Sequence, residues 1–320
     1  MSSEYEFNLS ELANLPMGAP PFLIQYFVHA ENLSILHGPP EAGKTYLAVL
    51  LALMAAGGGN WAGKFQTPKR PLRTCYVLTD GSKYDLGERI RYGMSLWPKS
   101  LLNFKAYVPP YIDLRSEASI QELIDVTAGY DLIFLDSLTS MTSGDVTKAE
   151  HMAPAMHGIR KLKMAHPDRG IVLLHHDHRQ KYTNTGEKIN EGGNAFAGSY
   201  VIQAEADMMW HITRPNPGLS ASASLEQSKS RSRFTKTDSF YVHLDPISGA
   251  LTAEGAPDTV ASKRIREWLR RVKEATTPEI HAWADSHKIS RSTTFRYLRA
   301  LVEDGVASRE NRGHYKWEDK

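Results

Sequence analysis

Short apolar runs and helical stretches alternate along the first three quarters of the chain. The runs are continuous rather than interrupted by polar residues, which is the pattern of strands buried on both faces. The clearest runs are LSILHG (33–38), TCYVLTD (74–80), DLIFLDS (131–137) and GIVLLHH (170–176). Helical patterns at 44–56, 83–94, 119–128 and 149–165 separate these and further strand-like runs at 104–110, 207–213, 223–230 and 239–245. Strands separated by helices predict an α/β fold with a parallel-rich central sheet.

The pattern changes near residue 245, where Gly, Pro, Ala and Ser become frequent. This composition predicts a linker, followed by a small domain of three short helices and a hairpin. Two sets of apolar residues at helical spacing mark the inward faces of the first and third helices: Ile265, Trp268, Leu269 and Val272, then Phe295, Leu298, Leu301 and Val302. The predicted parts are an N-terminal segment (1–30), the α/β core (31–245), the linker (246–261) and the small domain (262–320).

Composition narrows the class of protein. The 320 residues are 41% hydrophobic and 23% charged, as in soluble globular proteins, and no run approaches the roughly 20 apolar residues of a membrane span. The N-terminus lacks the blocks of a signal peptide, and the single cysteine, Cys75, excludes an internal disulfide. We therefore expect a cytoplasmic protein without membrane contact. Residues 261–320 carry 14 Lys and Arg against 9 Asp and Glu, a net of +5 that favours either nucleic acid or a solvated helical surface.

Residues 38–45, GPPEAGKT, match G-x-x-x-x-G-K-[ST] and lie between a predicted strand and a predicted helix. The backbone N–H groups of such a loop and the positive end of the following helix bind phosphates. The predicted ATP-binding residues are Gly38, Pro39, Pro40, Glu41, Ala42, Gly43, Lys44 and Thr45. Lys44 would reach the β- and γ-phosphates, and the Thr45 hydroxyl would ligate Mg²⁺.

Two strands end on a carboxylate. Asp136 follows four apolar residues and is expected to hold Mg²⁺ directly or through water, although it could instead cap the next turn. Hydrolysis also needs a group that orients the attacking water. Because Ser137, and not an acid, follows Asp136, we expect Asp80 to take that catalytic role. The alternative for Asp80, which precedes Gly81, is a turn residue.

These motifs, taken in order over about residues 20–245, resemble the RecA-type ATPases and in particular the RepA-type hexameric helicases. The matching stretches are 20–45 around the P-loop, GGGNWAGKFQ with TCYVLTDGS, LIFLDSLTSM, GIVLLHHDHR, AGSYVIQAEADMMWHI and SKSRSRF. The resemblance implies a RecA-like P-loop NTPase core that uses ATP and Mg²⁺ and assembles as a homo-oligomeric ring, a hexamer. The family carries a catalytic Glu where this chain has Asp80, which draws the carboxylate back by about 1 Å. We therefore expect ATP binding with weaker hydrolysis, because a displacement of that size costs about a hundredfold in rate.

The resemblance also implies roles for residues beyond the P-loop. His176 matches a sensor that donates to the γ-phosphate; a structural histidine or a zinc cluster with its neighbours are the alternatives. Lys229 and Arg231 match residues that reach a neighbouring subunit's nucleotide, the alternative being an edge strand protected by charge. Loops 138–148 and 177–198 are expected to line the ring channel and bind single-stranded DNA, or else to be solvated loops. The predicted DNA contacts of the second loop are Arg179, Lys181 and Lys188.

The small C-terminal domain resembles the winged-helix domains of transcription regulators, with SRSTTFRYL (290–298) as the recognition helix. The residues predicted to contact duplex DNA are Arg291, Thr294, Arg296, Arg299 and, on the wing, Arg312. A protein-interaction module is the alternative.

Together these features predict an ATP-hydrolysing, helicase-like ring motor that acts on the DNA of a replicon or mobile element. The alternative is an ATP-dependent oligomeric switch or loader that regulates DNA-bound partners without unwinding. A small-molecule kinase is disfavoured by the long polar loops and the C-terminal domain.

Overall fold

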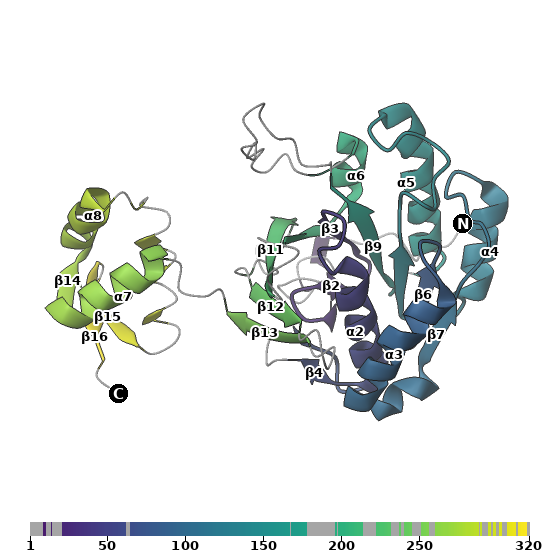
Figure 1. Cartoon of the computed structure of the whole chain (residues 1–320). Helices are drawn as coiled ribbons and strands as arrows, with labels where there is room; N and C mark the ends of the chain where they lie inside the picture. The colour runs from purple at the N-terminus through teal and green to yellow at the C-terminus, as the bar shows by residue number, and fades with distance from the viewer. Residues whose placement is uncertain are drawn as a thin grey trace. The chain divides into compact units, whose positions relative to one another are not determined.

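The computed structural model of the chain is shown in Figure 1. It describes residues 9–10, 14, 21–61, 65–166, 168–177, 196, 198–213, 222–231, 237, 240–244, 251–255, 260–287, 289, 294–295, 297–298, 301–302, 306–311 and 313–318. The chain divides into two compact units, Met1–Gly255 and Ala256–Lys320, and each is considered by itself. Within the described ranges, no helix combines the length and the apolar character needed to cross a membrane.

The first unit is built on a nine-stranded sheet with the order β13-β12-β11-β10-β3-β9-β8-β6-β7. The strands from β10 to β7 in this order run parallel, and β11, β12 and β13 extend the sheet with antiparallel pairs. Their bounds are β3 (Leu33–Gly38), β6 (Thr74–Leu78), β7 (Phe104–Tyr107), β8 (Leu132–Asp136), β9 (Gly170–His176), β10 (Met208–Thr213), β11 (Ser222–Ser230), β12 (Phe240–Leu244) and β13 (Leu251–Gly255). The predicted parallel-rich α/β sheet is confirmed.

Helices cover both faces of this sheet (Figure 1). On one face lie α2 (Lys44–Gly57) and α3 (Lys83–Leu96), and on the other α4 (Glu117–Val126) and α5 (Ala149–Met164). Successive strand residues point to opposite faces: Tyr76 and Phe134 pack with α2, whereas Cys75 and Ile133 pack with α4 and α5. Burial on both faces is the physical reason why these strands read as continuous apolar runs.

Several smaller elements were not expected from the sequence. They are the hairpins β1 (Phe22–Ile24) with β2 (Val28–His29) and β4 (Asn60–Trp61) with β5 (Phe65–Gln66), the 3₁₀ turn η2 (Pro98–Leu102) and the short helix α6 (Tyr200–Glu205). The predicted N-terminal segment 1–30 therefore holds two strands whose buried residues join the core. The predicted linker 246–261 contains β13, which pairs with β12, so this segment is in part sheet and not only linker.

The second unit contains α7 (Val260–Val272), β14 (Glu274–Thr276), α8 (Thr277–Ser286), β15 (Ala307–Asn311) and β16 (His314–Trp317). Residues 294–295, 297–298 and 301–302 are helical, and the sheet order is β14-β16-β15. Two residues predicted to face inward are exposed: Val272 (37%), the last residue of α7, and Phe295 (46%), whose ring is nearly perpendicular to that of His281. The core of this unit instead centres on Ile265, Leu269 and Leu298 with their neighbours.

Candidate nucleotide-binding site

The P-loop joins β3 to α2 at the carboxyl edge of the sheet. Gly43 has a φ of 95°, in the left-handed region that favours glycine. A Cβ on Gly38 would lie 2.2 Å from the backbone oxygen of Ile212 on β10, so only glycine allows the two strands to approach. The backbone conformation at Gly43 and the close approach of β10 at Gly38 therefore favour glycine at both of these positions of the motif.

The Lys44 side chain folds back onto its own loop. Its Nζ donates hydrogen bonds of 2.8 Å to the backbone oxygens of Gly38 and Pro39, and the residue is only 6% exposed. Burial lowers the pKa of Lys44 to about 8, while the charges of Asp177, Asp136 and Asp80 oppose that shift. The Lys44 ammonium group thus lies among carboxylates. A bound phosphate would accept the hydrogen bonds that Lys44 now donates to the Gly38 and Pro39 oxygens.

Asp136 lies at the end of β8 and is almost fully buried. Burial raises the pKa of its carboxyl, against hydrogen bonds from the Tyr76 hydroxyl (2.8 Å) and from the Thr45 hydroxyl. The predicted magnesium ligands Thr45 and Asp136 therefore lie close enough for their side chains to interact. This hard-oxygen pair beside the P-loop fits Mg²⁺, which favours carboxylate and hydroxyl oxygens.

Asp80 lies just beyond β6, which is separated from β3 by β8 and β9. Its Oδ2 is 3.5 Å from Nε2 of His176 and accepts a long hydrogen bond, 3.4 Å, from the Ser137 hydroxyl. The side chain is 53% exposed. Among the described residues no group buries this carboxylate or binds it tightly, as expected for an acid that faces a ligand.

His175 and His176 point to opposite sides of β9, as the alternation of strand side chains requires. His175 is fully buried and packs on Phe196, with ring centroids 5.0 Å apart. His176 is half-buried, and its Nδ1 makes no hydrogen bond within the described residues, so Nε2 is the nitrogen that faces Asp80. The structure thus brings the predicted residues Lys44, Asp80 and His176 to one edge of the sheet.

Lys229 and Arg231 do not lie with Lys44, Asp80 and His176. Their side chains donate to the backbone oxygens of Gln203 and Ala204 at the end of α6, and Arg231 also lies 3.2 Å from Asp207. Lys229 is aligned with Met209 of β10, which in turn is aligned with Ile35, three residues before the P-loop. Within this subunit both residues cap the carboxyl end of a short helix, where positive charge is stabilising.

Most predicted DNA contacts fall outside the described residues. These are Arg179, Lys181, Lys188, Arg291, Arg296, Arg299 and Arg312. Thr294 is described, and it is fully buried, which contradicts its predicted exposure to DNA. Thr294 lies one helical turn before Leu298, which belongs to the buried core of the second unit.

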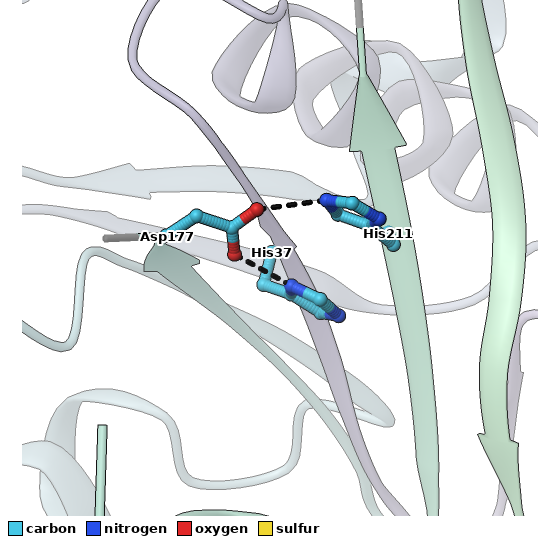
Figure 2. Close-up of side chains that lie close together, drawn as sticks. All are labelled: His37, Asp177 and His211. Carbon is cyan, nitrogen blue, oxygen red and sulfur yellow. Dashed lines mark hydrogen bonds and ion pairs between the residues drawn. The ribbon is translucent and has the colours of Figure 1, made fainter. Parts of the chain in front are cut away.

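A cluster that the sequence did not reveal lies next to the P-loop (Figure 2). The Asp177 carboxylate accepts hydrogen bonds of 2.7 Å from Nδ1 of His37 and from Nε2 of His211. The two imidazole rings are stacked, 4.7 Å apart and only 9° from parallel. Burial opposes ionisation of Asp177, but the hydrogen bonds from His211 and His37 outweigh it and lower the pKa to about 2. Polar residues at the carboxyl ends of otherwise apolar strands were the only sequence signal for this cluster.

The second unit has a groove of about 390 Å³ between α7 and α8. It is lined by Arg264, Glu267, Trp268, Arg271, Trp283 and His287. The Trp283 ring stacks on Trp268 at 5.0 Å and on His287 at 4.3 Å. Helical spacing predicts that Trp268 faces the core, whereas its ring is only partly buried.

A family model described as an AAA domain matches residues 16–181, which is 166 of the 320 residues. The chain belongs to this AAA domain family. ATP binding at the P-loop and ATPase chemistry are properties of such domains, so the predicted nucleotide site agrees with the family. No curated protein sequence matches the chain.

Similar folds occur among solved structures. One is the RadB recombinase, with 13% identity and a TM-score of 0.47 over 70% of this chain and 91% of that one. Another is the flagellar accessory protein FlaH from Methanocaldococcus jannaschii, with 12% identity and a TM-score of 0.45 over 71% of this chain and 91% of that one.

Proposed function

We propose that this protein is an ATP-hydrolysing, helicase-like motor that acts on DNA as a homo-oligomeric ring. The observation that carries hydrolysis is the grouping of Asp80, His176 and Ser137 at the sheet edge beside the P-loop. Asp80 would orient the attacking water, and His176 would donate to the γ-phosphate. Thr45 and Asp136 would hold Mg²⁺, which supplies charge neutralisation for the transferred phosphoryl group.

DNA binding is the second part of the proposal. The C-terminal unit has the order helix, strand, helix, helical residues and two strands, which supports a winged helix. Residues 261–320 of this unit carry the net charge of +5 that duplex DNA would attract. Single-stranded DNA would contact the loop that follows Asp177, and Arg291, Arg296, Arg299 and Arg312 would contact duplex.

Ring assembly is the third part. Lys229 and Arg231 lie away from the nucleotide site of their own subunit, which suits a role in a neighbour's site. In that role they would have to leave the α6 carbonyls that they now bind. An Arg231→Ala variant that still assembles but no longer turns over ATP would support this arrangement.

One experiment tests the motor as a whole. Steady-state ATP turnover of the full chain is measured with and without single-stranded DNA, with Lys44→Ala as the inactive reference. We expect DNA to raise turnover several-fold in the native protein and Lys44→Ala to abolish it. Turnover that DNA leaves unchanged would refute the motor.

The alternative function is an ATP-dependent oligomeric switch or loader that binds protein partners. The groove of the second unit favours it, because Trp and Arg are over-represented among the residues that dominate protein–protein binding. The short acid at Asp80 would then keep turnover low. ATP-driven oligomerisation with turnover near zero would select this alternative.

A further inference from the structure

The Asp177 carboxylate connects three neighbouring strands at the P-loop end of the sheet. His37 is the residue of β3 directly before the P-loop, His211 lies on β10, and Asp177 directly follows β9. The backbone N–H of Asp177 also donates to the Gly38 oxygen, which Lys44 binds as well. We call His37, Asp177 and His211 the Asp177 clamp.

The clamp contains ligand types that zinc uses, and its three ligand atoms lie within 4.8 Å of one another. An imidazole binds a metal through an in-plane lone pair, so an ion shared by two histidines must lie close to both ring planes. The rings of His37 and His211 are stacked and within 9° of parallel, so no point between them lies in both planes. The arrangement suits two N–H donors that point at the two oxygens of one carboxylate (Figure 2).

The proton positions follow from these contacts. A carboxylate only accepts hydrogen bonds, so His37 carries its proton on Nδ1 and its Nε2 faces the Ser228 hydroxyl at 3.2 Å. Burial lowers the pKa of His37, although the hydrogen bond to Asp177 opposes this shift. Ser228 belongs to β11, so the contacts of the clamp extend across four adjacent strands.

The clamp acts on the residue next to it. His176 directly precedes Asp177, and its Nε2 lies 3.5 Å from Asp80. Because Asp177 is bonded through both its side chain and its backbone, the end of β9 has little freedom to move relative to the P-loop. The distance between His176 and a phosphate bound at Lys44 therefore depends on the clamp.

We propose that Asp177 is a positioning residue for ATP hydrolysis: by bridging His37 and His211 it fixes where His176 lies relative to the P-loop and Asp80. This inference rests on the proposed hydrolytic function. It assigns Asp177 no contact with the nucleotide. Loss of the clamp should therefore affect turnover much more than nucleotide binding, because a shift of about 1 Å costs about a hundredfold in rate.

The kinetic test uses Asp177→Ala and His211→Phe, the second of which keeps a ring stacked on His37 but removes its N–H. The matched control is Asp131→Asn, which removes a carboxylate with hydrogen bonds to Arg70 and Arg73 at the other end of the sheet. We expect kcat to fall at least about 10-fold in both clamp variants, with the Kd of a fluorescent ATP analogue changing by less than about threefold. A kcat that falls no further than in the control, or equal losses in kcat and affinity, overturns the proposal.

A second measurement separates failure of the clamp from failure of the proposed function. In the ¹⁵N spectrum of histidine-labelled native protein, we expect two slowly exchanging imidazole N–H signals, both lost in Asp177→Ala and both kept in Asp131→Asn. Their presence together with absent turnover would refute hydrolysis but leave the clamp in place. Signals that persist in Asp177→Ala overturn the clamp, as does one equivalent of Zn²⁺ that removes both of them from the native protein.

Discussion

The two ends of strand β8 carry an aspartate each, in opposite environments. At the amino end, Asp131 accepts two hydrogen bonds of 3.0 Å from Arg70 and one of 2.8 Å from the Arg73 backbone. Burial works against ionisation of Asp131, but these bonds lower the pKa of its carboxyl below the usual value. At the carboxyl end, burial raises the pKa of Asp136, whose carboxylate accepts a hydrogen bond from the Tyr76 hydroxyl.

The same contrast holds for the two ends of the whole sheet. At the amino end, the buried guanidinium of Arg169 donates to three backbone oxygens, those of Tyr130, Leu162 and Thr127. At the carboxyl end, Lys44 binds two carbonyls of its own loop, and the contacts of Asp80 with described residues are long, at 3.4 and 3.5 Å. At the amino end these charges are saturated by protein groups, whereas Lys44 and Asp80 at the P-loop end retain capacity for a ligand. Asp177, at the same end, is the exception, because its two oxygens accept hydrogen bonds from His37 and His211.

We expect the largest effect on kcat from substitution of Asp80, at the carboxyl end of the sheet, compared with Asp131 at the amino end. We expect Asp80→Asn to lower kcat about a hundredfold, because the amide no longer orients the attacking water as a base. Asp80→Glu should keep or raise turnover, since it restores the reach of the longer acid. The check is steady-state phosphate release, with Asp131→Asn as the control that stays within about twofold of native. Equal activity in all three variants would refute the role of Asp80 and support a turn residue.

The pH dependence of ATP binding tests the charge of Lys44 at the P-loop end. We expect a smaller effect than from substitution of Asp80. The folded protein holds the pKa of Lys44 at about 8, so the free site loses this positive charge as the pH rises through 8. Bound phosphates require the charged form, so binding above pH 8 takes up a proton. We expect the Kd of ATP to rise about 10-fold from pH 7 to pH 9, as one group with this pKa dictates. Calorimetry in buffers of different ionisation enthalpy measures the proton uptake. A Kd that stays constant, with no proton uptake, would contradict the requirement for charged Lys44.

The smallest effect is expected at the amino end. Arg70 is 64% exposed although it binds both oxygens of Asp131. Exposed ion pairs contribute little, so Arg70→Ala should lower the free energy of unfolding by at most about 1 kcal/mol and leave turnover unchanged. Urea unfolding measures this, with the exposed neighbour Lys69→Ala as control. A loss well above that of an exposed pair would show that the amino end is more tightly coupled to the core.

Much of the core could be predicted because its signals are local. The run 33–38 and the P-loop after it specify a strand, a turn and a helix start through residues that are adjacent in sequence. Short elements such as α6 could not be predicted, because six residues are too few to show a helical period. The composition of strand β13 predicts a linker, because its Gly- and Ala-containing sequence becomes a strand only by pairing with β12.

Local patterns alone predict the α/β class, the P-loop and the residues Lys44, Asp80, Asp136 and His176 that lie around it. These depend on patterns read along one stretch of chain. Only the tertiary structure decided that Lys229 and Arg231 cap α6, that Thr294 is buried, and that His37, Asp177 and His211 meet. Asp177 is 140 residues from His37 and 34 from His211. Which strands become neighbours is set by packing the whole sheet, and no local pattern encodes it.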